Sequence, residues 1–234
     1  KPLVGCEIYM AQRGRHDREP RKDDRPFHLT LLAKDREGYR NLTQLVSAAH
    51  LEGYYYKPRV DRELLARHSK GLVALSGCLR GEVNDALLQD DPHLAAEKLG
   101  FYRDVFGEDL FVELMDHGLP EQRKTNPELV RLAREFGLKT VATNDAHYLN
   151  REDASLQDIL VCIQTGKNLD DQKRMKFSAP EFYLKSGEEM LSAFNWVPEA
   201  IHNTLEVADR CQLEMDLESV FLPSFPVPGG GTAE

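Results

Sequence analysis

Five side chains that can bind metal stand at or next to strand-like runs of the sequence: Glu7, His28, Cys78, Asp145 and His147. Glu7 interrupts the apolar run LVGCEIY, where a carboxylate is costly unless it is paired or binds a cation. His28 opens the run HLTLLA, and Cys78 follows the run GLVALS. Each has a plain structural alternative: Glu7 facing solvent, a hydrogen-bonded His28, and Cys78 as a small apolar residue.

Asp145 and His147 form a more specific pattern, D-x-H, directly after VATN. In an extended chain, residues i and i+2 point to the same side, about 6.5 to 7 Å apart at Cα. The pair would therefore direct a carboxylate and an imidazole at one region, although an Asp cap beside a surface His fits equally well. The combined nitrogen, oxygen and sulfur ligands favour zinc, with manganese or iron as alternatives.

Strand-like and helical segments alternate around these residues. Apolar runs predict strands over 3–10, 27–33, 71–76, 109–115 and 138–145, and helical spacing predicts helices over 35–53, 92–107, 126–137, 156–163 and 200–211. This alternation favours a parallel sheet covered by helices. No Gly-rich phosphate loop follows the first strand, which argues against a doubly wound sheet and favours a β/α barrel, whose working residues lie at the carboxyl ends of its strands.

Composition narrows the classes of function. The 234 residues carry a net charge of −9, so the chain does not hold a nucleic-acid duplex by bulk electrostatic attraction. Residues 12–26 mix basic and acidic side chains and predict an exposed, solvated loop, with contact to a DNA backbone as the alternative. The apolar runs are too short to span a membrane. The four cysteines show no C-x-x-C spacing, which favours a reducing, cytoplasmic location.

Several longer runs carry a resemblance to a known family. KPLVGCEIYM, FHLTLLAKDREGYRNLTQLVSAAH, LVALSGCLRGEV, FVELMDHG and VATNDAHYL resemble the polymerase-and-histidinol-phosphatase (PHP) domain of bacterial DNA polymerase III alpha subunits. NLDDQKRMKFSAPEFYLKSGEEM is similar to the stretch that leads toward the polymerase palm. The resemblance implies an α/β fold, a distorted (β/α)7 barrel, with a trinuclear metal centre. It also implies that Glu7, His28, Cys78, Asp145 and His147 occupy metal-ligand positions, with no separate catalytic residue.

The same resemblance implies that part of the domain lies outside these 234 residues. The family's H-x-H motif, a further Asp and an Asp-His pair are absent here, so we expect a barrel that is incomplete at its N-terminus. We expect residues 1–222 to form the PHP domain without its first strands, and the Pro/Gly-rich residues 223–234 to form a linker toward the palm. Such a segment alone should bind metal weakly and lack hydrolytic activity.

The function predicted from this resemblance is metal-dependent 3′–5′ exonuclease activity within a DNA-synthesising polymerase subunit. The partners would be primer-template DNA and other replicative subunits, with no membrane. Glu113 and His117, near the end of the 109–115 strand, are weaker candidates for contact with substrate, with a solvated loop as the alternative. Two other functions remain open: a non-catalytic, metal-stabilised docking module of the polymerase, and a small-molecule phosphoesterase of the histidinol-phosphatase type.

Overall fold

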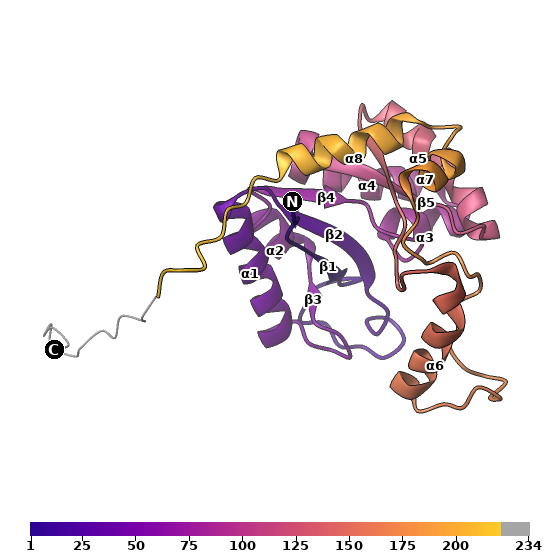
Figure 1. The fold of residues 1–234 in the computed structure, drawn as a ribbon. Helices are drawn as coiled ribbons and strands as arrows, with labels where there is room; N and C mark the ends of the chain where they lie inside the picture. Colours follow the sequence, from indigo (N-terminus) through magenta and orange to yellow (C-terminus); the bar gives the residue numbers. More distant parts are fainter. Residues whose placement is uncertain (221–234) are drawn as a thin grey trace, which may run out of the picture.

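The computed structural model of the chain describes residues 1–220, so the expected linker at 223–234 lies outside the described residues (Figure 1). The described strands form one six-stranded mixed sheet in the order β3-β1-β2-β4-β5-β6. Their bounds are β1 Gly5–Met10, β2 Phe27–Ala33, β3 Arg59–Val60, β4 Leu72–Leu75, β5 Leu110–Met115 and β6 Lys139–Thr143. The alpha/beta class is confirmed. The described strands form a sheet with β3 and β6 at its edges, so barrel closure stays a prediction.

The direction of β2 differs from the expected parallel arrangement. β2 runs antiparallel to both of its neighbours, β1 and β4, whereas β1 with β3, β4 with β5, and β5 with β6 pair in parallel. A parallel pair needs a crossover connection, usually a helix, but β1 and β2 are joined by a loop without one. As a result, the first residues of β2 lie beside the carboxyl ends of β1 and β4.

The helices follow the sequence pattern where they are long. In the described residues they are α1 Arg36–Leu51, α2 Arg62–Arg67, α3 Glu82–Leu88, α4 Pro92–Phe106, α5 Pro120–Glu135, α6 Ala154–Thr165, α7 Gly187–Ala193 and α8 Glu199–Arg210. The predictions for α1, α4, α6 and α8 are confirmed to within a few residues. α5 begins at Pro120 instead of residue 126, because Pro120 takes the first-turn position and Pro127 lies inside the helix. No helix among the described residues is long and apolar enough to cross a membrane.

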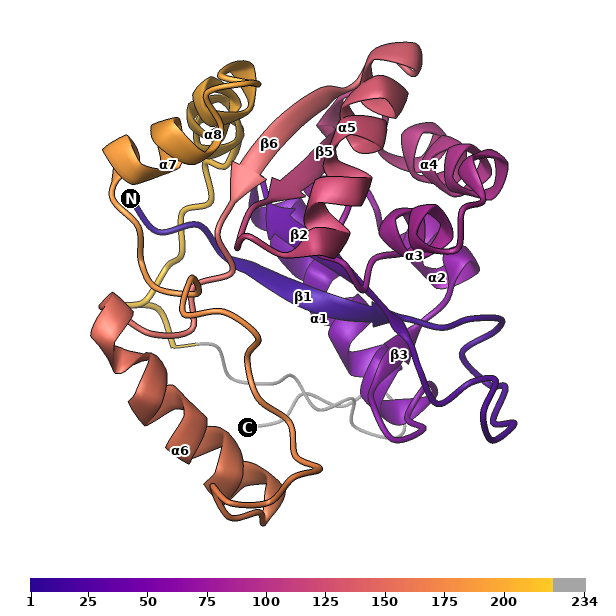
Figure 2. The ribbon, with the colours of Figure 1, turned by 90° about the vertical axis from the view of Figure 1, so that its right-hand side faces the viewer.

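The two faces of the sheet are covered differently. One face packs its apolar side chains, such as Met10, Leu29 and Val112, against helices α1 to α5. On the other face, α8 packs over β4, β5 and β6, and Val207 and Cys211 join a second apolar cluster there. Over β1 and β2 this second face is more open and carries polar side chains. Figure 2 shows α6 lying apart from the sheet, on the side of that open region.

The charged loop between β1 and β2 is bound around a buried arginine. Arg59 has no exposed surface, and its guanidinium donates hydrogen bonds to the carbonyls of Arg15 (3.0 Å), Asp17 (2.8 Å), Asp23 (3.0 Å) and Gly53 (3.0 Å). Asp23 is also fully buried. The prediction of an exposed loop is confirmed for most of residues 12–26. The sequence did not show that Asp23 is buried, or that backbone carbonyls of the loop accept hydrogen bonds from an arginine 36 residues beyond Asp23.

We expect Arg59→Met to destabilise the chain by roughly 3 kcal/mol or more, because it leaves several buried carbonyls without donors. Thermal unfolding and limited proteolysis within residues 12–26 would measure this. Arg25→Met changes an exposed arginine of the same loop and serves as the control. Equal melting temperatures for Arg59→Met and Arg25→Met would contradict the anchoring role.

Candidate metal centre

Three of the predicted ligands meet at one point. The Glu7 Oε1 and His28 Nδ1 atoms are 3.0 Å apart, and Cys78 Sγ lies 3.6 Å from the same ring nitrogen. One ligand atom from each of the three residues lies within 4.8 Å of the other two. A carboxylate oxygen, an imidazole nitrogen and a thiol sulfur at this separation form a ligand set that a divalent transition metal can bind.

Strand register explains why these residues meet. Glu7 pairs with Thr30 and Tyr9 pairs with His28, so Glu7 and His28 stand on the same open face of neighbouring strands. Because β2 is reversed, His28 lies at the end of the sheet where the chain leaves β4 toward Cys78. Gly77 makes this approach possible: its φ is +90°, and a Cβ there would lie 2.4 Å from the carbonyl oxygen of His28.

Two opposite pKa shifts mark the cluster. The hydrogen bond with His28 holds the pKa of Glu7 below its ordinary value, against the opposing effect of partial burial. Burial raises the pKa of Cys78 to about 11, although the backbone N–H of Arg80 points at its sulfur at 3.5 Å and acts in the other direction. The free thiol therefore keeps its proton at neutral pH, and a metal that binds there must displace it.

Asp145 and His147 lie on the segment that follows β6, outside the three-residue cluster. Their side chains are together, with 3.8 Å between Asp145 Oδ1 and His147 Nδ1. The backbone is not the extended one assumed from the D-x-H spacing, because Asp145 has a left-handed φ of +46°. Their charges reach the cluster: a protonated His147 ring lowers the pKa of Glu7, and the Asp145 carboxylate contributes to the raised pKa of Cys78.

The ring of His147 is held in one orientation. Its Nδ1 lies 2.7 Å from the backbone oxygen of Asp145, and since a carbonyl only accepts, Nδ1 carries the proton. The other nitrogen, Nε2, is then the one that can bind a metal. The ring also packs against Phe177 and Phe182, with centroid distances of 4.7 and 5.9 Å, and the backbone N–H of His147 donates to the Phe182 carbonyl at 2.7 Å.

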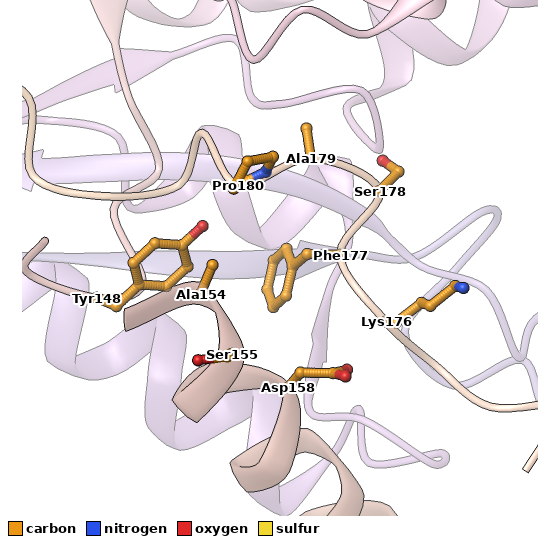
Figure 3. A pocket seen from close by; sticks show the side chains of 9 residues that line it. All are labelled: Tyr148, Ala154, Ser155, Asp158, Lys176, Phe177, Ser178, Ala179 and Pro180. Atoms are coloured by element: carbon orange, nitrogen blue, oxygen red, sulfur yellow. The ribbon is translucent and has the colours of Figure 1, made fainter. Parts of the chain in front are cut away.

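The strap, defined as residues 176–185, was missed by the sequence reasoning. Tyr183 forms a strand-like bridge with Tyr148, and its carbonyl accepts a hydrogen bond from the Asn144 side chain. A pocket of about 280 Å³ lies between the strap and α6. Figure 3 shows the side chains that line it, among them the ring of Tyr148. Its lining residues are Tyr148, Ala154, Ser155, Asp158, Lys176, Phe177, Ser178, Ala179 and Pro180. In the sequence, the aromatic residues of FSAPEFY indicate that this segment packs against other parts of the protein.

Comparison with known proteins identifies the family. Residues 1–117 match the model of the PHP domain. This chain belongs to the PHP domain family. The PHP chain is 46% identical to the DNA polymerase III subunit alpha of Thermus aquaticus over 240 residues, which include 99% of this chain and 20% of that protein. It is 47% identical to the same subunit of Treponema pallidum over 230 residues, with coverages of 97% and 20%.

A third relative gives the same result. The DNA polymerase III subunit alpha of Deinococcus radiodurans is 45% identical over 240 residues, which include 98% of the PHP chain and 18% of that protein. The resemblance drawn from the sequence runs is thus confirmed. The PHP chain spans about a fifth of the length of these curated relatives.

The two weaker candidates of the PHP chain, Glu113 and His117, are buried, at 4% and 1% exposure. His117 Nε2 lies 2.7 Å from the Asn144 carbonyl and donates to it, and Nδ1 accepts from the Gln122 side chain at 2.8 Å. Both ring nitrogens are therefore used within the protein. Glu113 lies in the middle of β5, and its carboxylate accepts hydrogen bonds from the Gly77 N–H and the Thr143 hydroxyl.

The carboxylate of Glu113 should make stability depend on pH. Burial raises its pKa from 4.5 to about 7, so between these values the folded chain holds a proton that the unfolded chain releases. The stability that this bound proton contributes to the folded chain is fully present below pH 4.5 and is lost as the pH rises to about 7. We expect Glu113→Gln to gain stability relative to the wild type between pH 5 and 8, by up to about 3 kcal/mol.

The measurement is denaturant unfolding of both chains at pH 5 and 8 with a chelator present. Taking the difference between wild type and variant removes the contribution of every other titrating group. A difference that stays constant from pH 5 to 8 would show that Glu113 does not titrate in this range.

Proposed function

We propose that this PHP domain binds zinc and hydrolyses phosphodiester bonds at a primer 3′ end, within a DNA-synthesising polymerase subunit. The observation that carries the proposal is the convergence of Glu7, His28 and Cys78, whose ligand atoms lie within 4.8 Å of one another. Manganese or iron are alternatives, but imidazole and thiolate ligands favour zinc. The four cysteines are free thiols, which suits the reducing cytoplasm where replication takes place.

The donor set fits a catalytic centre better than a closed structural one. Three protein ligands leave a coordination position for water, whereas structural zinc sites are closed by four. Asp145 and His147, whose side chains lie 3.8 Å apart and whose charges act on Glu7 and Cys78, would bind a neighbouring metal of the same centre. We propose the (β/α)7 barrel as the fold of the domain, with the open face of β1 and β2 turned toward its interior.

The protein's own groups would prepare the site in distinct ways. Glu7 has a lowered pKa and so supplies a carboxylate that stays ionised at neutral pH. The Asp145 carbonyl fixes the tautomer of His147 that leaves Nε2 free. When bound, the metal would supply a nucleophile by lowering the pKa of water and would stabilise charge on the attacking and leaving oxygens. No separate protein base is required for this chemistry.

The substrate would come to the site through the rest of the polymerase. With a net charge of −9 the chain does not attract a DNA backbone by itself, so primer-template DNA would be held by the polymerase body or by other replicative subunits. The relatives that the chain matches are named as polymerase alpha subunits, which favours this setting over a free-standing histidinol phosphatase.

A non-catalytic metal-stabilised module is the second candidate. It is favoured by the ion pair of His28 with Glu7 at 3.0 Å, which already holds two of the three ligands together, so that a metal bound there would add to the stability of the fold. The two functions differ in whether Asp145, which lies outside the cluster, affects hydrolysis.

We expect Asp145→Asn in the full-length protein to reduce 3′–5′ hydrolysis of a primer by about 100-fold or more and to leave polymerisation largely unchanged. The amide keeps the volume of the side chain but removes the charge that holds a dication. The measurement is primer shortening without nucleotides, beside primer extension with them. Asp209→Asn on the exposed surface of α8 is the control. Hydrolysis at the wild-type rate in Asp145→Asn would favour the non-catalytic module.

Metal content tests the site independently of activity. We expect Cys78→Ser to lower the zinc bound per full-length chain after dialysis against a weak chelator, because a hydroxyl is a poorer zinc ligand than a thiolate. Cys162→Ser, at a buried cysteine of α6, is the matched control. Equal zinc content in wild type and Cys78→Ser would remove Cys78 from the ligand set.

A further inference from the structure

We propose that Glu113 is a positioning residue of the metal centre, which holds the loop that carries Cys78 in register with the loop that carries Asp145 and His147. The inference rests on the metal site proposed above. It assigns Glu113 neither a metal nor a substrate contact. The residue would act through the backbone and side chains of two neighbouring strand ends.

The contacts of Glu113 reach both loops. One carboxylate oxygen, Oε2, accepts the backbone N–H of Gly77 at 3.0 Å, and the other, Oε1, accepts the Thr143 hydroxyl at 2.7 Å. The backbone N–H of Glu113 donates to Ser76 Oγ at 2.9 Å. β5 lies between β4 and β6 in the sheet, so a single side chain on β5 can bond to the ends of both.

Gly77 and Thr143, the two residues bonded to Glu113, lie close to the proposed metal ligands, so a small shift of their backbone would move those ligands. Gly77 precedes Cys78 and has a φ of +90°, and a Cβ added to it would lie 2.4 Å from the carbonyl oxygen of His28. Thr143 stands two residues before Asp145, whose φ of +46° is uncommon for a residue with a side chain. Metal-ligand distances are held to within about 0.2 Å, so these turns must be fixed for the ligands to meet.

The surroundings of Glu113 leave little space for a substrate. It lines a cavity of about 10 Å³ together with Cys78, Asn84 and Gln122, which is room for about one water molecule. Both of its oxygens already accept hydrogen bonds inside the protein. A buried carboxylate is costly, and an apolar side chain would fill the position at lower cost if packing were its only role.

The two hydrogen bonds of the Glu113 side chain, to the Gly77 N–H and the Thr143 hydroxyl, are called the brace here. The brace depends on the position of the two bonding groups at residue 113 more than on their charge. In Glu113→Gln the amide oxygen can accept from Gly77, and the amide N–H can donate to the Thr143 hydroxyl oxygen. Glu113→Leu has a similar volume and can make neither bond. Thr143→Val removes one of the two links without changing the buried carboxylate. Thr140→Val makes the same substitution three residues earlier on β6 and is the matched control.

The experiment measures cobalt(II) and zinc binding by the full-length protein, using competition with a chromophoric chelator and the thiolate-to-cobalt charge-transfer absorption. We expect Glu113→Leu and Thr143→Val to lose about 10-fold to 100-fold in affinity, as is usual for residues that orient ligands. Glu113→Gln and Thr140→Val should stay within about threefold of wild type. If Glu113→Leu fails to fold, Thr143→Val still decides the matter.

The outcomes separate this inference from the proposed site. If the wild type binds neither metal, or if Cys78→Ser keeps the charge-transfer band, the proposed site itself fails. Suppose that the wild type binds the metals and that Cys78→Ser loses the charge-transfer band. A metal affinity of Thr143→Val equal to that of the wild type then overturns the positioning role of Glu113. A loss in Glu113→Gln as large as that in Glu113→Leu also overturns it, because charge and not position would then be what Glu113 supplies.

Discussion

The reversal of β2 is the constraint on which the candidate centre depends. Glu7 on β1 and Cys78 after β4 stand on strands that run in the same direction, and β2 lies between these two strands. A third parallel strand would have carried His28, near its start, to the opposite end of the sheet. Because β2 is antiparallel to both neighbours, its second residue meets the cysteine and the glutamate. The loop that permits this reversal is in turn fixed by the buried Arg59.

In this fold, buried ionisable side chains form hydrogen bonds with backbone groups of irregular segments, which have no partners in a helix or a strand. Arg59 satisfies four carbonyls of irregular segments, and the Glu113 carboxylate accepts a backbone N–H from the turn after β4. Irregular backbone inside a protein must find hydrogen-bond partners, and a charged side chain offers several at once. The same device therefore holds the loop that reverses β2 and the turn that presents Cys78.

Residue types and short-range pattern predicted much of this molecule. β2 has the predicted bounds, 27–33, because its side chains alternate between the two faces, and Glu7, His28 and Cys78 were identifiable as metal-competent residues. The direction of β2 and the hydrogen bonds that hold the preceding loop could not be predicted from the sequence, since they depend on contacts with residues far along the chain. Helices α2, α3 and α7 have six or seven residues, too few to show a clear period.

The charge of the domain connects the proposed metal to the proposed substrate. A phosphodiester is an anion, and the site that would receive it contains the carboxylates of Glu7 and Asp145 within a chain of net charge −9. Without a cation these groups would repel the substrate at short range, where screening by salt is weakest. A dication bound by Glu7, His28 and Cys78 would reverse the sign of the local field. Metal binding would then be a condition for substrate approach as well as for hydrolysis.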